Sequence, residues 1–151
     1  MIKAVLFDMD DTLLDINLTA FMTAYIADVS RILSQISGTP TLAFGGAWAR
    51  AYLAIASDAR TDGLTNLELF SATIERLTGV PMADPAITDA ISYYEQNVLP
   101  RRRGGIVSAR PKEGGIAAIE RARSMGLAVA LATNPSFSEA CIRTRMGWAH
   151  I

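Results

Sequence analysis

Two short apolar runs lie near opposite ends of a chain of 151 residues. Residues 3–7 lead directly into a cluster of carboxylates, and residues 127–132 lead into Thr133 and Asn134. Runs of this length that end in polar residues predict strands buried on both faces of a parallel sheet. Residues 112–125 have helical spacing and precede the second run, with Gly126 suited to the C′ position of that helix. A helix followed by a buried strand is typical of an α/β fold.

The region between the two runs has a different pattern. From about residue 17 to residue 98 the apolar residues recur at helical spacing, which predicts helices throughout. The expected helices are a stripe from Phe21 to Ile36 closed by Gly38, a stripe from Trp48 to Ile55, one that follows a capping box of Thr65 and Glu68, and one that starts at Asp84. We therefore expect a helical domain, residues 16–105, inserted into an α/β core made of residues 1–15 and 106–151.

Composition excludes several classes of protein. The formal net charge of −1 argues against a general nucleic-acid binder. Cys141 is the only cysteine, so an internal disulfide is excluded and a reducing compartment such as the cytoplasm fits. His150 is the only histidine, which argues against a histidine-based catalytic centre. No apolar run approaches the roughly 20 residues that a membrane helix needs, so we expect no membrane partner.

Three carboxylates, Asp8, Asp10 and Asp11, follow the first predicted strand. Like charges this close repel each other, so the cluster costs stability unless the negative charge is used. Asp8 would lie at the carboxyl edge of the sheet, where open α/β folds bind ligands. Carboxylate and carbonyl oxygens are the ligands that Mg²⁺ prefers. The alternative is a polar turn that caps a helix, but capping needs one carboxylate and not three.

The stretch FDMDDT, residues 7–12, resembles the first motif of the haloacid dehalogenase superfamily, an apolar strand followed by Asp-x-Asp-x-Thr. The stretch ATN, residues 132–134, is similar to its second motif, a Thr or Ser that ends the next core strand. The helical insert resembles the mobile cap that some members carry after the first strand. The resemblance covers essentially the whole chain, and it implies a Rossmann-like parallel-sheet core with an inserted α-helical cap.

The resemblance also implies roles for single residues. Asp8 would be the nucleophile that forms an aspartyl-phosphate, and its carboxylate would bind Mg²⁺. Asp10 would protonate the leaving oxygen and later deprotonate water, while its backbone carbonyl binds the metal. Thr133 would hold the phosphate, and Asn134 would either assist or cap the following helix. Asp11 stands where the family often has Gly, so we expect no catalytic role for it.

Two motifs of the family are missing from these residues. The third is a Lys beyond the second motif, but Lys3 and Lys112 both precede Thr133. The fourth is one or more acids on a later strand, and Glu139 is the only acid after Thr133. Two strands also do not make a stable parallel sheet. We therefore expect the chain to be the N-terminal part of a longer enzyme, with an incomplete core and negligible activity alone.

The sequence thus predicts a cytoplasmic Mg²⁺-dependent phosphatase of small phosphorylated metabolites, because Asp10 suits a phosphate ester, whose leaving oxygen needs a proton. The alternative is a non-catalytic fragment or a binding or regulatory module built on the same core, for which exposed apolar sheet edges would favour self-association. The basic run at residues 101–103 is either a solvated loop or the border of a cleft that attracts an anionic substrate. The helical stripes do not reveal which metabolite the cap would select.

Overall fold

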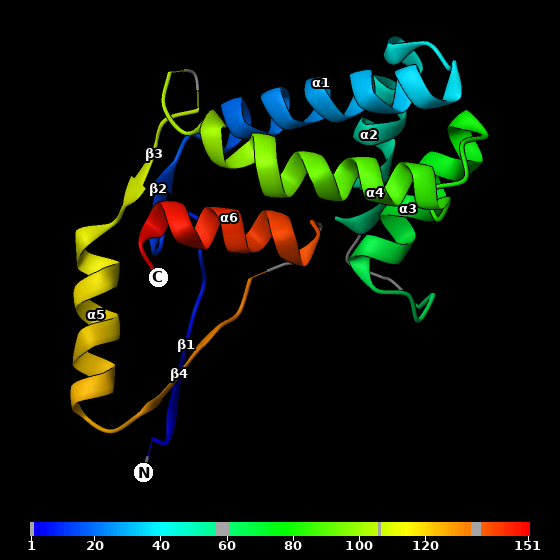
Figure 1. The fold of residues 1–151 in the computed structure, drawn as a ribbon. Helices are drawn as coiled ribbons and strands as arrows, with labels where there is room; N and C mark the ends of the chain where they lie inside the picture. The colour runs from blue at the N-terminus through cyan, green and yellow to red at the C-terminus, as the bar shows by residue number, and fades with distance from the viewer. Residues whose placement is uncertain (1, 57–60, 106, 134–136) are drawn as a thin grey trace.

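The computed structural model describes residues 2–56, 61–105, 107–133 and 137–151 (Figure 1). Asn134, a predicted phosphate ligand, therefore lies outside the described residues. In chain order the elements are β1 (Ala4–Phe7), β2 (Leu14–Ile16), α1 (Leu18–Ser37), α2 (Thr41–Ile55), α3 (Asn66–Thr78), α4 (Pro85–Tyr93), the π-helical turn η1 (Tyr94–Val98), the 3₁₀ turn η2 (Leu99–Arg102), β3 (Ala109–Pro111), α5 (Glu113–Ser124), β4 (Ala128–Leu131) and α6 (Glu139–Ala149).

The two predicted strands form a parallel pair. Val5 of β1 lies opposite Val129 of β4, and Phe7 lies opposite Leu131, so the predicted α/β class with a parallel sheet is confirmed. The prediction that both faces are buried is wrong, because side chains along each strand alternate between exposed and half-buried. Leu6 is 69% exposed. Helix α5 contacts β4, but within the described residues nothing buries the face that carries Leu6.

A second, antiparallel ladder joins β2 and β3, and the sequence did not predict it. Its central pair is Asp15 and Arg110, whose side chains also form an ion pair with an Nε to Oδ2 distance of 2.7 Å. Strands of three residues are too short to show an alternating pattern. The ladder joins the segment that leaves the core to the segment that returns to it, close to the boundaries at residues 15–16 and 105–106 that we infer for the inserted domain.

The predicted helices are present, and their ends follow local chemistry. Helix α1 ends at Gly38, which has the left-handed conformation that glycine adopts at low cost. Helix α3 begins with the expected capping box, in which Glu68 accepts a hydrogen bond from the backbone N–H of Thr65 at 2.8 Å. That bond lowers the pKa of Glu68. Helix α4 starts after Asp84, whose side chain accepts from the N–H of Ala86.

Two of the three arginines at residues 101–103 make structural contacts. Arg102 donates to the buried carboxylate of Asp28, which also accepts a hydrogen bond from the hydroxyl of Tyr94 at 3.0 Å. Burial and the negative charge of Asp28 raise the pKa of Tyr94. Arg103 donates to the carbonyl of Ala109 at 2.9 Å. The run therefore fastens the returning chain to α1 and β3, a role that neither interpretation of the sequence included.

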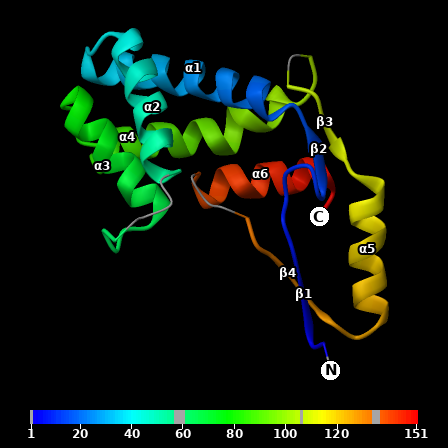
Figure 2. The same cartoon turned by 180° about the vertical axis from the view of Figure 1, so that it is seen from behind.

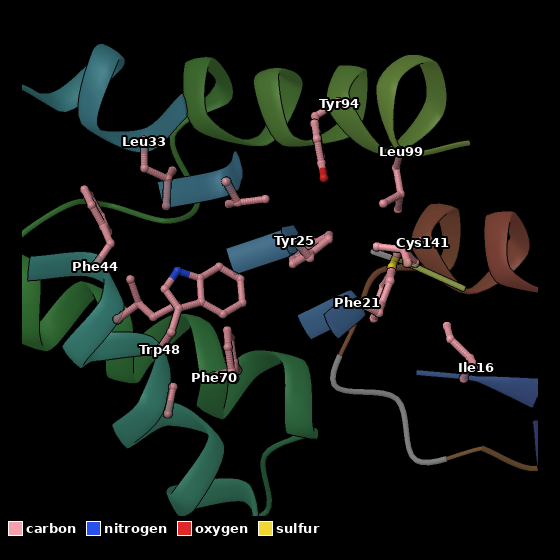
Figure 3. Close-up of a cluster of buried hydrophobic side chains, with 14 of the residues drawn as sticks. Ile16, Phe21, Tyr25, Leu33, Phe44, Trp48, Phe70, Tyr94, Leu99 and Cys141 are labelled. Atoms are coloured by element: carbon pink, nitrogen blue, oxygen red, sulfur yellow. The ribbon is translucent and has the colours of Figure 1, made fainter. Parts of the chain in front are cut away.

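The core lies among the helices and not around the parallel strands. Figures 1 and 2 show α1, α4 and α6 crossing the molecule above the β1–β4 pair, which extends below them. Large side chains from α1, α2, α3, η1 and α6 fill the space between the helices (Figure 3), including Phe21, Tyr25, Leu33, Phe44, Trp48, Phe70, Tyr94 and Cys141. Among the described residues, no helix is long and apolar enough to cross a membrane.

Candidate active site

The parallel pairing of β1 and β4 brings two predicted site residues to one edge of the sheet. Phe7 and Leu131, the last residues of the two strands, are partners in the ladder. The backbone N–H of Ala132 donates to the Phe7 carbonyl at 2.8 Å, which extends the pairing by one step. Asp8 follows Phe7 directly, and Thr133 follows Ala132. The carboxylate and the hydroxyl therefore leave the sheet side by side.

These residues line a cavity of about 190 Å³ between the core and the inserted helices. Asp8, Asp10 and Thr133 line it from the core side together with Phe137 and Arg145. The inserted helices contribute the apolar side of the cavity through Leu18, Met22, Tyr52, Ile55 and Ala56. Drug-sized ligands generally occupy pockets of about 300–1,000 Å³, so this cavity suits a small group such as a phosphoryl.

The loop after β1 is a tight turn that aims two carboxylates at the same cavity. The carbonyl of buried Met9 accepts from the N–H groups of Leu13 and Leu14, both at 2.9 Å. These bonds close the loop, and Asp8 and Asp10, two positions apart in it, both line the cavity. The hydroxyl of Thr12 lies 3.5 Å from Oδ2 of Asp8 and donates to it.

The start of helix α5 fastens the same loop from outside. The backbone N–H of Lys112 donates to the carbonyl of Leu13 at 2.8 Å, and its Nζ donates to the carbonyl of Asp11. At Gly115 a Cβ atom would collide with the backbone carbonyl of Thr12, so only glycine allows this approach. Lys112 is thus used in holding the loop, and it does not line the cavity that contains Asp8 and Asp10.

Arg145 is a residue of the site that sequence reasoning missed. It projects from α6, its side chain is 3% exposed, and its Nη2 atom forms an ion pair with Oδ1 of Asp10. Its guanidinium also lies over the ring of Phe21, 4.9 Å from the centroid. A buried charge is costly unless it is paired, so the contact with Asp10 accounts for the position of Arg145. The cavity therefore contains a cation that matches neither of the missing family motifs.

The sequence does contain a signal for Arg145. Cys141, Arg145 and Trp148 are spaced at i, i+4 and i+7, so they share one face of α6. Cys141 and Trp148 are buried, at 0% and 4% exposure, and that face packs on the core. A charged residue in the middle of a buried helical face indicates that it has an ionic partner. The carboxylates of the first motif were candidates for that partner, and Asp10 is the one that the structure shows.

The oxygen donors of the cavity fit Mg²⁺ in part. Within the described residues there is no group of three or more His, Cys, Asp or Glu side chains that could hold a metal ion. Mg²⁺, however, keeps several waters and is usually bound through one or two carboxylates together with the phosphate of a substrate. Asp8 and Asp10 both line the cavity, and the Asp8 carboxylate and the Asp10 carbonyl would be donors of that kind.

The conformation of Asp11 leads to a prediction about stability. Its φ of 56° lies in the left-handed region, which Asp tolerates and β-branched residues do not. We expect Asp11→Val to lower the free energy of unfolding by about 1–2 kcal/mol, and Asp11→Gly to change it by less than about 0.5 kcal/mol, since relief of strain offsets the greater freedom of the unfolded chain. Urea denaturation measures both. Equal midpoints for the two variants would contradict this account of the loop.

Comparison with known families matches residues 2–151 to the haloacid dehalogenase-like hydrolases. The match spans both the α/β segments and the inserted helices, so it agrees with the resemblance seen in the two motifs. A search of curated proteins found no match.

Proposed function

This chain belongs to the haloacid dehalogenase-like hydrolase family, and from that membership we propose that the protein is a Mg²⁺-dependent phosphatase. Its substrate would be the phosphoric monoester of a small metabolite. The observation that carries the proposal is that Asp8, Asp10 and Thr133 line one cavity although Thr133 is far from the others in sequence. Two carboxylates and a hydroxyl at the carboxyl edge of the strands would supply the nucleophile, the proton carrier and one phosphate donor for phosphoryl transfer through an aspartate.

In the first half of the proposed reaction, a carboxylate oxygen of Asp8 attacks phosphorus. The new bond joins Asp8 to the phosphoryl group, and the bond from phosphorus to the ester oxygen breaks. Asp10 gives its proton to that oxygen, so the metabolite leaves as an alcohol. The loop supports this assignment of nucleophile and acid. Asp8 and Asp10 are separated by one residue in a loop closed by hydrogen bonds, so both carboxyl groups could reach one phosphoryl group.

In the second half, water attacks the phosphorus of the aspartyl-phosphate. Asp10, now a carboxylate, accepts a proton from the water, and the bond from phosphorus to Asp8 breaks. Inorganic phosphate leaves, and Asp8 is restored. Arg145 pairs with Oδ1 of Asp10, so this contact would hold the Asp10 carboxyl group in position beside the cavity in both halves of the reaction.

The phosphate would be held by Thr133 and Arg145. The hydroxyl of Thr133 is a donor at the end of β4, and an arginine presents several N–H groups in a planar fork that matches phosphate oxygens. Arg145 lines the cavity while it pairs with Asp10, so a bound phosphate would be its second partner. Mg²⁺ would be held by the Asp8 carboxylate and the Asp10 carbonyl, and when bound it would offset the negative charge of the phosphate.

The proposal includes a cytoplasmic location and a cap formed by residues 16–105. Cys141 is free and buried, which is consistent with a reducing compartment. The apolar residues of α1 and α2 that close the catalytic cavity support a role of the inserted helices in covering the substrate.

The test compares two reaction classes in the protein produced from its complete reading frame. We expect release of phosphate from p-nitrophenyl phosphate and from small sugar phosphates, and loss of more than 90% of the rate, an order-of-magnitude expectation for removal of the metal, when EDTA removes Mg²⁺. We expect no halide from 2-chloropropionate. A departing halide needs no proton, so a dehalogenase has no use for an acid at the position of Asp10, whereas a phosphatase does. Release of halide without release of phosphate would reject the proposal.

A further inference from the structure

A second and larger cavity lies on the other side of Phe137. Its volume is about 350 Å³, and residues of α1, α2, α3, α4, η1 and the start of α6 line it. It contains neither Asp8 nor Asp10, and Phe137 is the only described residue that lines both cavities. The volume is in the range of small-molecule pockets, at their lower end. This aromatic cavity is therefore a separate place where a ligand could bind.

One wall of the aromatic cavity is a continuous series of rings. Phe70 packs against Trp48 with centroids 4.7 Å apart, Trp48 against Tyr25 at 5.8 Å, and Tyr25 against Phe137 at 5.3 Å. The interplanar angles are 64°, 79° and 87°, so each pair packs edge to face, and Figure 3 shows Tyr25, Trp48 and Phe70 converging from α1, α2 and α3. The face of an aromatic ring carries partial negative charge and attracts organic cations. Arg145 lies over the ring of Phe137, 5.5 Å from its centroid, whereas among the described residues no cation lies over Tyr25, Trp48 or Phe70.

The same cavity contains a buried carboxylate, that of Glu95, which is 2% exposed. Its two oxygens accept hydrogen bonds from the hydroxyl of Tyr25, at 2.7 Å, and from the hydroxyl of Ser138. Both donors are neutral, since Ser138 carries an alcohol, and burial together with the charge of Glu95 raises the pKa of Tyr25 well above its usual value. No ion pair involving Glu95 is present within the described residues, so its hydrogen bonds are satisfied while its charge is not balanced by direct contact.

The described residues that line the aromatic cavity include no lysine, arginine or histidine. Glu139 adds a second carboxylate at the edge, where it is exposed and pairs with Arg143 of its own helix at 2.7 Å. The cavity is thus negatively charged, and its walls are mostly apolar. A ligand that complements this environment has a positive charge on a compact apolar body.

We propose that the aromatic cavity binds a small alkylammonium ion, with the charge beside Glu95 and the alkyl groups against Tyr25, Trp48 and Phe70. Buried carboxylates are stabilised by an opposite charge, and alkylated ammonium groups are weakly hydrated enough to leave water for an aromatic site. The site does not depend on the proposed phosphatase activity, since none of its charged residues takes part in that chemistry.

The experiment titrates the chain with choline and with 3,3-dimethylbutan-1-ol, which has the same shape but no charge. Isothermal titration calorimetry on the unmodified protein is expected to show saturable binding of choline, at least about tenfold tighter than binding of the neutral alcohol, from the worth of a desolvated cation–π contact. Equal affinity for the two compounds, or no binding of choline at millimolar concentration, would overturn the proposal.

Variants locate the site. Glu95→Gln keeps the side chain's shape and removes its charge, so we expect choline affinity to fall at least about tenfold while the neutral alcohol is unaffected. Glu120→Gln makes the same chemical change on α5, away from the cavity, and should leave both affinities unchanged.

Phe70→Leu keeps the charge and removes one ring, and it should weaken choline binding several-fold. If Glu95→Gln fails to fold, as circular dichroism would show, Phe70→Leu decides: unchanged choline affinity in that variant contradicts the site.

Discussion

Replacing Asp8 by Asn is expected to lower kcat for p-nitrophenyl phosphate by at least about 10⁴-fold, which is the scale of loss when a nucleophile is removed. An amide oxygen is a far weaker nucleophile than a carboxylate, and Asn also removes one negative charge from the loop that would hold Mg²⁺. The measurement is the steady-state rate of nitrophenolate release by the protein produced from its complete reading frame.

Asp11→Asn is the matched control for that experiment. It makes the same chemical change three residues away, at an exposed position whose φ of 56° Asn adopts readily. The contact with Lys112 uses the Asp11 carbonyl and not its side chain, so it survives the substitution. We expect kcat within about twofold of the unmodified protein, a change of less than about 0.5 kcal/mol in the barrier. A large loss in both variants would show that the charge of the loop matters and that Asp8 has no special role.

Replacing Arg145 by Met is expected to lower the free energy of unfolding by about 2–3 kcal/mol. The side chains of Arg145 and Asp10 are 3% and 24% exposed. Removing one partner of a buried pair costs about 3–5 kcal/mol, and we expect less because water reaches Asp10. The expected cost comes mainly from the carboxylate that is left without a counter-ion. Urea denaturation of the 151-residue chain measures it.

A double-mutant cycle separates the ion pair from the packing of Arg145. Asp10→Asn combined with Arg145→Met should recover at least about 1 kcal/mol of the loss, because no unpaired charge remains. Arg143→Met is the matched control on the same helix, since Arg143 is exposed and pairs with Glu139 four residues away. We expect it to change stability by less than about 0.5 kcal/mol. Additive effects in the cycle would mean that the pair with Asp10 does not hold Arg145 in place.

The helices could be predicted from the sequence because their ends are determined locally. The capping box of Thr65 and Glu68, the aspartate at 84 and the glycines at 38 and 79 act within one turn of the residues they terminate. The parallel pairing of β1 and β4 was also accessible, since helix followed by apolar strand has few arrangements. Asp8 and Thr133 were expected at one sheet edge, and the structure places both in the same cavity.

The remaining features depend on contacts between distant segments. The β2–β3 ladder pairs residues whose own sequences carry no strand pattern, such as Asp15 and Arg110. Leu6 is exposed because, within the described residues, no other element covers that face of β1. The residues of the strand itself do not show whether a neighbouring element covers it. Arg145 was missed because its partner Asp10 lies 135 residues away in the sequence. Glu95 was missed for the same reason, since its partner Tyr25 lies on another helix.

The most direct test of the account is whether a phosphoryl group becomes attached to Asp8. Asp10→Asn protein from the complete reading frame is mixed with p-nitrophenyl phosphate and Mg²⁺, quenched in acid and mapped by peptide mass spectrometry. Nitrophenolate leaves without needing a proton, while water attack lacks its base, so the intermediate should accumulate. We predict one phosphoryl group on the peptide that contains Asp8, and none in the Asp8→Asn, Asp10→Asn double variant. A phosphoryl group on another residue, or turnover by the unmodified enzyme with no labelled Asp8, would contradict the central claim.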